Sequence, residues 1–91
     1  MKRFVLVTTA KKGVFAGFLE AEDGDSVDLT EARMCIYWPS ECRGVLGLAS
    51  VGPLKGARIS PAVPSATLGH VTGIFDCTEE ARALWEAEPW S

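Results

Sequence analysis

The chain has 91 residues, a formal net charge of −3 and 47% hydrophobic residues. This length leaves room for one hydrophobic core, so we expect a single domain over residues 1–91 and exclude a two-domain organisation. The acidic balance argues against a protein that mainly neutralises phosphates, so a nucleic-acid partner is not expected. So much apolar surface on a small chain instead predicts a homo-oligomer.

The sequence contains no recognisable secretory signal, because the apolar run Phe4–Val7 is too short for one. No apolar run reaches membrane-spanning length, so no membrane partner is expected. The cysteines Cys35, Cys42 and Cys77 include no C-x-x-C pair, which argues against a disulfide framework or a zinc site. We therefore expect reduced thiols in a cytoplasmic protein, with no metal ion and no cofactor.

Two β-strands are predicted at the start of the chain. Residues 3–9 (RFVLVTT) are rich in β-branched and aromatic residues, and a polar turn follows at Lys11-Lys12-Gly13. The next strand, over residues 13–20, has apolar residues on both faces, so we expect it to lie centrally or to be covered by a neighbour. Within it, Gly17 is expected to mark a β-bulge or a close backbone approach.

A hairpin is predicted at Glu22-Asp23-Gly24-Asp25, because Asp-Gly readily adopts the positive φ of a tight turn. Two strand pieces follow, at about residues 26–29 and 33–38, and residues 30–32 are expected to bend or bulge the path between them. Pro39 ends the second piece.

The middle of the chain is less regular. Residues 43–52 fit either a single helical turn or a short buried strand, and the turn is slightly favoured. Several prolines and glycines make residues 52–66 an irregular connection, with a short extended piece near Arg58 and Ile59. Residues 68–76 then alternate between apolar and polar side chains, which predicts one strand.

A C-terminal helix is predicted over about residues 79–88. Thr78 is a suitable N-cap, and Glu79 begins an acidic first turn. Leu84 and Trp85 are expected to dock this helix on the sheet. The predicted fold is mainly β (α+β), with a small antiparallel sheet or a partly open barrel of about five strands and one C-terminal helix.

Four motifs extend over most of the chain: GVFAGFL at residues 13–19, VxLxxAR at residues 27–33, the pair Tyr37-Trp38, and CTxxA at residues 77–81. Together they resemble an uncharacterised family of small proteins of tailed phages and prophages. The resemblance implies a phage or prophage origin, hence a host cytoplasm, and no established activity.

A weaker similarity concerns G-x-x-x-G-x-L at residues 13–19, followed by a turn and V-x-L at residues 27–29. This order is similar to the second and third strands of Sm-like and SH3-like small barrels, which often form rings by strand addition at open edges. The chain lacks the characteristic second Sm motif, and its helix is C-terminal where the Sm helix is N-terminal. The similarity implies a fold and carries no function by itself.

No catalytic constellation is predicted. His70 and Asp76 fall on one face of the predicted strand but about 20 Å apart at ~3.3 Å per residue, unless the chain bends, so a surface histidine is favoured over a His–Asp pair. Cys77 precedes the predicted helix N-terminus, where a thiolate is stabilised, but nothing in the sequence indicates a base or a substrate site near it, and a structural cysteine is favoured.

The candidate ligand or interface residues are Tyr37, Trp38, Arg33, Arg58 and Trp90. Tyr37 and Trp38 either form a stacking wall for a flat ligand or divide between the core and an interface, and the second interpretation is favoured. Arg33 and Arg58 bind a phosphate only if they converge, and otherwise act as salt-bridge partners. Trp90, beyond Pro89, packs back on the domain or reaches a partner.

The leading hypothesis from the sequence is a non-enzymatic, homo-oligomeric phage accessory or structural protein. A small-ligand or nucleotide-binding module that sequesters host signals is the first alternative. The second is a small barrel that binds nucleic acid weakly.

Overall fold

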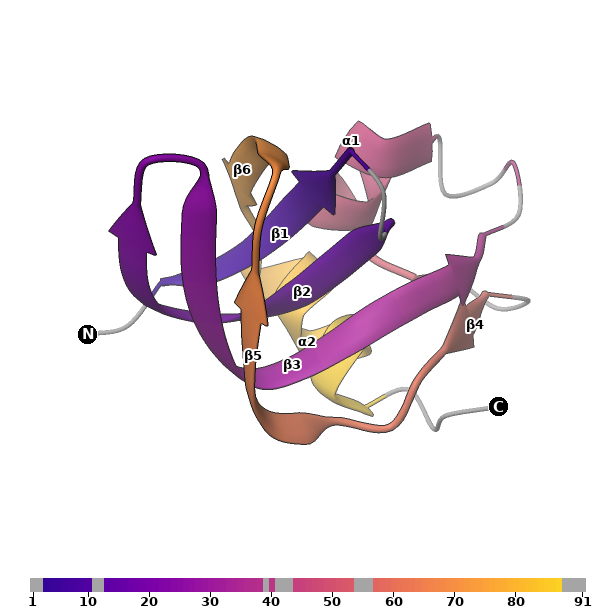
Figure 1. The fold of residues 1–91 in the computed structure, drawn as a ribbon. Coiled ribbons are helices and arrows are strands. Elements are labelled where there is room, and N and C mark those ends of the chain that lie inside the picture. The colour runs from indigo at the N-terminus through magenta and orange to yellow at the C-terminus, as the bar shows by residue number, and fades with distance from the viewer. Residues whose placement is uncertain (1–2, 11–12, 39, 41–43, 54–56, 88–91) are drawn as a thin grey trace.

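The computed structural model describes residues 3–10, 13–38, 40, 44–53 and 57–87. Figure 1 shows a curled β-sheet with short helices beside it. The elements in chain order are β1 (Phe4–Thr9), β2 (Val14–Asp23), β3 (Ser26–Tyr37), α1 (Gly44–Ser50), β4 (Arg58–Ile59), β5 (Val63–Leu68), β6 (Val71–Asp76) and α2 (Glu79–Ala87).

All the strands belong to one six-stranded antiparallel sheet in the order β4-β3-β2-β1-β6, with β5 also paired to β3. The long strand β3 pairs with β2 along one edge. Along its other edge it pairs with β5 near its start and with β4 near its end. The predicted class, a mostly β fold with a C-terminal helix, is confirmed; the sheet has six strands where about five were predicted, and it is not closed.

The sheet curls because β5 and β6 are consecutive in the chain but lie on opposite sides of the strand order. Only Gly69 and His70 connect them, and His70 has a φ of 55°. Backbone hydrogen bonds fix this corner: the Ala10 N–H donates to the His70 carbonyl at 2.9 Å, and the Val71 N–H donates to the Asp25 carbonyl at 2.9 Å. The corner therefore joins the hairpin end of the molecule to the end of β1.

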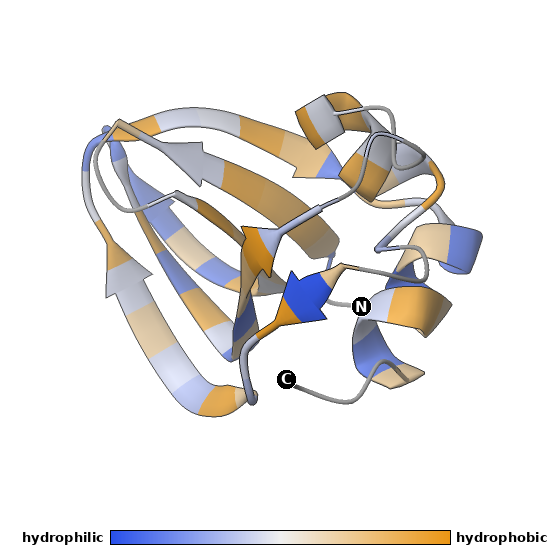
Figure 2. Cartoon of the chain, turned by 90° about the vertical axis from the view of Figure 1, so that its right-hand side faces the viewer, coloured by the Kyte–Doolittle hydropathy of each residue, from blue (hydrophilic) through white to orange (hydrophobic). Residues whose placement is uncertain are grey.

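Two hydrophobic cores lie on the two faces of the curled sheet. One, between the sheet and the helices, includes Leu6, Leu48 and Trp85. The other, inside the curl, includes Val7 and Leu29. Figure 2 shows how apolar and polar residues alternate along the strands. Successive side chains point to opposite faces of the sheet, so this alternation decides which residues enter each core. Strand β1 contributes to both cores, so its residues 4–7 are all buried.

A β-bulge interrupts β3 at the position where a bend was predicted. Ala16 pairs with Arg33 and Phe18 with Thr30, so β3 has one residue more than β2 between these pairs, and Glu31 has a φ of 53°. Gly17 lies opposite the bulge, where a Cβ atom would stand 2.8 Å from the Thr30 carbonyl oxygen. The close approach predicted at Gly17 is confirmed, and the two predicted pieces of 26–38 form one bulged strand that ends at Tyr37.

Helix α2 begins as predicted. The Thr78 hydroxyl accepts a hydrogen bond from the Ala81 N–H at 3.0 Å and donates one to the Ser50 carbonyl at 2.7 Å, so it caps α2 and ties it to the end of α1. Trp85 is fully buried, and Leu84 is partly buried beside Gly52.

The predicted boundaries were wrong in four places. The predicted strand 68–76 is two strands, because the backbone turns at His70. The connection assigned to 52–66 contains the start of β5 at Val63. This strand was not predicted because Pro61 and Pro64 are typical of irregular segments. The slightly favoured single turn in 43–52 is a seven-residue helix, and the second strand continues to Asp23, past the predicted residue 20.

Candidate functional site

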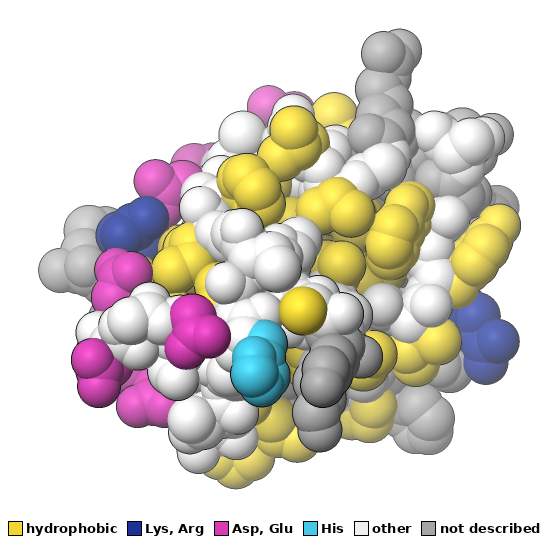
Figure 3. Space-filling model, turned by 45° about the horizontal axis from the view of Figure 1, so that its top comes forward, with side chains coloured by type: hydrophobic (Ala, Val, Ile, Leu, Met, Phe, Trp, Pro, Cys, Tyr) yellow, Lys and Arg dark blue, Asp and Glu magenta, His cyan; other side chains and the backbone are white. Residues whose placement is uncertain are grey.

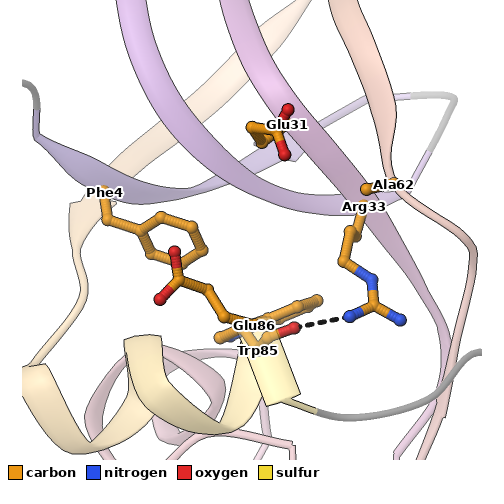
Figure 4. A pocket seen from close by; sticks show the side chains of 6 residues that line it. All are labelled: Phe4, Glu31, Arg33, Ala62, Trp85 and Glu86. Carbon is orange, nitrogen blue, oxygen red and sulfur yellow. Dashed lines mark hydrogen bonds between the residues drawn. The ribbon is translucent and has the colours of Figure 1, made fainter.

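A cavity of about 160 Å³ opens between the bulge of β3 and the last turn of α2. Figure 4 shows it from close by. Its lining residues are Phe4, Glu31, Arg33, Ala62, Trp85 and Glu86. Ligand pockets for drug-sized molecules usually have about 300–1,000 Å³. This cavity therefore suits a small group or one side chain.

The β-bulge sets the direction of Arg33. Side chains alternate along a strand, so without the extra residue Arg33 would share the face of Leu29, inside the curl. Its guanidinium instead reaches α2: Nη1 donates to the Trp85 carbonyl at 2.7 Å and Nε donates to the Ser60 carbonyl at 2.8 Å. Arg33 thus fixes the C-terminal turn of α2 and the connection between β4 and β5.

Two buried aromatic side chains border the cavity. Trp85 is fully buried, and its indole Nε1 donates to the Leu48 carbonyl at 3.1 Å. Phe4 is also buried, and it packs edge-to-face on Phe18, with 5.2 Å between the ring centroids. These rings therefore belong to the packed core and offer almost no surface to a group in the cavity.

Two carboxylates face the cavity from different elements, Glu31 from β3 and Glu86 from α2 (Figure 4). The Glu86 carboxylate also contacts the guanidinium of Arg82 at 3.5 Å, an exposed pair of the kind that contributes little energy. The Arg33 guanidinium lines the same cavity, so the lining carries two negative charges and one positive charge. This excess of one negative charge favours a cationic group over a phosphate.

An apolar strip runs beside the cavity along the outer edge of β3, and we call it the outer-edge strip. Its members are Ile36, Tyr37, Pro61, Ala62 and Val63. Ile36 is 51% exposed, Tyr37 54% and Val63 46%. Val63 pairs with Ala32 of β3, and the Ser60 N–H donates to the Met34 carbonyl at 2.9 Å. These two contacts hold the segment between them, Pro61 and Ala62, alongside β3 in the middle of the strip.

The structure distributes the predicted site residues over different places. Tyr37 and Arg58 are exposed neighbours across the β3–β4 pairing, whereas Trp38 is partly buried against the core beneath the helices. Arg33 is engaged at the cavity, and Arg58 is not among the cavity's lining residues. Trp90 lies outside the described residues.

The groups considered for catalysis, Cys77, His70 and Asp76, are not among the residues that line the cavity. Burial, and to a lesser degree the nearby charge of Asp76, raise the pKa of Cys77 to about 12, so its thiol is protonated at neutral pH. The Nδ1 of His70 lies 4.0 Å from the Asp25 carboxylate at an exposed corner. Asp76 instead accepts a hydrogen bond from Arg3 Nε at 2.8 Å, which raises the pKa of that arginine.

Of the six lining residues, Arg33 was among the site residues proposed from the sequence, and the other five were not: Phe4, Glu31, Ala62, Trp85 and Glu86. The bend predicted at residues 30–32 was a signal for Glu31, because bulges often lie next to functional sites. Phe4 and Glu86 had no such signal, since they reach the cavity only through the packing of β1 and α2 on β3.

Charged side chains are unevenly distributed over the surface. Figure 3 shows acidic side chains gathered on one side and hydrophobic side chains across much of the remaining face. The exposed acidic residues of the β2–β3 hairpin include Glu22, Asp23 and Asp25. Within the described ranges, no group of three or more His, Cys, Asp or Glu side chains is arranged to hold a metal ion. The described helices are all too short to span a membrane.

The chain belongs to the family described as Domain of unknown function (DUF6948), whose model matches residues 2–85. The family description assigns no activity. A search of curated proteins and a search of solved structures each found no match to this chain.

Proposed function

We propose that this DUF6948 member is a non-enzymatic, homo-oligomeric accessory or structural protein encoded by a tailed phage or prophage. The observation that carries the proposal is the outer-edge strip, which no described element of the chain covers. Contiguous apolar surface of this kind typically marks a protein–protein contact. The phage origin is supported by the four sequence motifs.

Side chains, and not strand addition, are the better basis for the contact. Pro64 lies in the edge strand β5 and Pro61 in the connection between β4 and β5, and a proline has no N–H to donate to an added strand. Natural edge strands use proline in this way against uncontrolled pairing. In the strand order β6-β1-β2-β3-β5, the two end strands, β5 and β6, are consecutive in the chain, and this supports the similarity to a small barrel. The prolines argue against a ring of copies that pair through this edge.

A non-enzymatic role is supported by the state of the reactive groups. The Cys77 thiol has its pKa raised to about 12, and Arg33, the most strongly anchored charged residue at the cavity, donates to backbone carbonyls of the protein itself. The Cys77 thiol and the Arg33 guanidinium therefore serve the packing and hydrogen bonding of the domain itself.

Native mass spectrometry and light scattering test the proposal. We expect a discrete oligomer for the wild-type protein and a shift to monomer for Ile36→Ser and Tyr37→Ser. Leu46→Ser is the matched control, because Leu46 is 62% exposed on α1, away from the strip. A wild-type protein that stays monomeric at several hundred micromolar would refute the proposal, and equal weakening by Leu46→Ser would refute the assignment to the strip.

A small-ligand-binding module is the second candidate function, and the cavity is the observation that favours it. Its two carboxylates and its size favour a small amine or guanidine over a nucleotide. Isothermal titration calorimetry with methylguanidine, a diamine and a nucleotide panel tests this function. Saturable binding of an amine or guanidine, lost in Glu31→Gln, supports it, whereas flat titrations for all of them oppose it.

A further inference from the structure

We propose that Arg58 of a second copy of this chain inserts into the cavity between Glu31 and Glu86, and that the two copies do so reciprocally across a two-fold axis. The inference rests on the proposed homo-oligomer and gives it a geometry. It identifies the occupant of the cavity, the residue that enters it and the number of copies.

The cavity has the chemistry that a guanidinium group requires. Glu31 and Glu86 supply two carboxylates from different elements, and the one positive charge of the lining, Arg33, is bound to the Ser60 and Trp85 carbonyls. A planar guanidinium binds carboxylates with paired hydrogen bonds, which a compact ammonium does less well. At about 160 Å³ the cavity is matched to one side-chain head group.

Arg58 is the arginine available to enter such a site. The described residues contain four arginines: Arg3, Arg33, Arg58 and Arg82. Arg3 is paired with Asp76, Arg82 with Glu86, and Arg33 is bound to two carbonyls. Arg58 is exposed and forms no ion pair with the described part of its own chain.

The position of Arg58 relative to the cavity makes the contact self-complementary. Arg58 pairs with Tyr37 at the end of β3, and Glu31 lies six residues earlier, about 20 Å away along the strand at ~3.3 Å per residue. The outer-edge strip lies between them. A two-fold axis through the middle of the strip, near Pro61, therefore brings each Arg58 opposite the partner copy's cavity.

Such a contact also covers the apolar surface that is exposed in the single chain. The two strips meet in antiparallel orientation, with Ile36 and Tyr37 of one copy against Ala62 and Val63 of the other. A charged pair at each end of an apolar centre fixes both register and direction. Because a two-fold contact uses the same surface on both copies, the assembly closes at two.

The test uses two charge-reversal variants, Arg58→Glu and Glu31→Arg, alone and mixed in equal amounts, with native mass spectrometry at a fixed concentration. Alone, each variant brings like charges together at both ends of the strip, and we expect the dimer dissociation constant to rise at least ten-fold. Mixed, they form a heterodimer in which both ends again carry opposite charges, and we expect the affinity to recover.

The control variant is Asp23→Lys, which reverses a charge on the distant hairpin and is expected to leave the dimer intact. Circular dichroism spectra confirm that each variant is folded. Glu31→Arg keeps a non-glycine side chain at the φ of 53°, so it adds no backbone strain specific to the new residue.

The outcomes separate this inference from the proposed function. Wild-type dimer, weakened single variants and a restored heterodimer support both. A wild-type oligomer that both variants leave unchanged overturns the Arg58 contact while the homo-oligomer stands. A wild-type assembly of three or more copies overturns the two-fold geometry. A wild-type monomer overturns the proposed function itself.

Discussion

Glu31 and His70 adopt φ angles of 53° and 55°, in a region that costs a non-glycine residue about 1–2 kcal/mol. Each lies where the sheet changes course: Glu31 at the bulge of β3, and His70 at the corner between β5 and β6. The bulge directs Arg33 towards α2, and the corner allows the sheet to curl. Two residues with unusual backbone angles thus account for the bulge beside the cavity and for the corner that lets the sheet curl.

Gly17→Ala is expected to reduce the free energy of unfolding by about 1–3 kcal/mol, because its Cβ would stand 2.8 Å from the Thr30 carbonyl oxygen. Chemical denaturation monitored by tryptophan fluorescence measures the change. Gly69→Ala is the control, since a Cβ at Gly69 meets no atom within 4 Å. Equal effects of the two substitutions would contradict the close approach at the bulge.

The Cys77 thiol predicts a loss of stability in alkaline solution. In the unfolded chain the thiol ionises near its ordinary pKa of 9.0, while in the folded protein burial raises that pKa to about 12. The unfolded state therefore releases its proton first, and the free energy of unfolding falls as the pH rises from 9 to 12. Below pH 9 this group contributes its full stabilisation.

The variant Cys77→Ala removes this dependence. We expect the difference in unfolding free energy between wild type and variant to change by on the order of 1 kcal/mol between pH 8 and 11, after allowing for solvent screening of a half-buried thiol. Urea denaturation at a series of pH values measures the difference. A constant difference across this range would show that the thiol pKa is not raised.

At the scale of elements, the start of α2 depends on one hydroxyl with two partners. Thr78→Ala removes both the cap on Ala81 and the bond to Ser50, so we expect a loss of about 1–2 kcal/mol in the free energy of unfolding. Thr78→Ser keeps the hydroxyl and is expected to recover most of this loss. Thermal and urea denaturation of the two variants make the comparison, and equal losses would argue against the cap.

The sequence predicted the elements whose causes are local. The Asp-Gly hairpin, the Thr78 cap and the bulge near residue 31 follow from residue types within a few positions of one another. The division of 68–76 at His70 does not, because the adjacent Gly69 was included in the alternating pattern, and the corner is fixed by backbone hydrogen bonds to Ala10 and Asp25, which are distant in sequence. Strand β5 was missed because Pro64 lies on its open edge, where its missing N–H costs nothing.

The candidate site shows the same division. Arg33 was proposed from the sequence as a binding residue, and it does line the cavity, but its partners Ser60 and Trp85 come from other parts of the chain. The convergence of Glu31 with Glu86 is equally non-local. The type of each residue could be read from the sequence, whereas their meeting depends on how α2 packs across β3.

For the whole molecule, association predicts a thermal stability that depends on concentration. If folded copies bind each other, mass action raises the melting temperature as the protein concentration rises. We expect an increase of several degrees between 5 and 500 µM for the wild type and almost none for Tyr37→Ser. Differential scanning fluorimetry measures both, and an unchanged wild-type melting temperature would contradict self-association.

Strand β1 has a consequence for the order of folding. It is buried on both faces, and its pairing with β6 joins Val5 to Asp76, so almost the whole described chain lies between the two partners. Contacts of such long range are slow to form, because the entropy of closing a large loop is lost before the contacts stabilise the fold. During synthesis, β1 leaves the ribosome before β6, and until β6 follows, the apolar residues of β1 depend on the pairing with β2 for cover. Neither core can therefore be completed until β6 has been made.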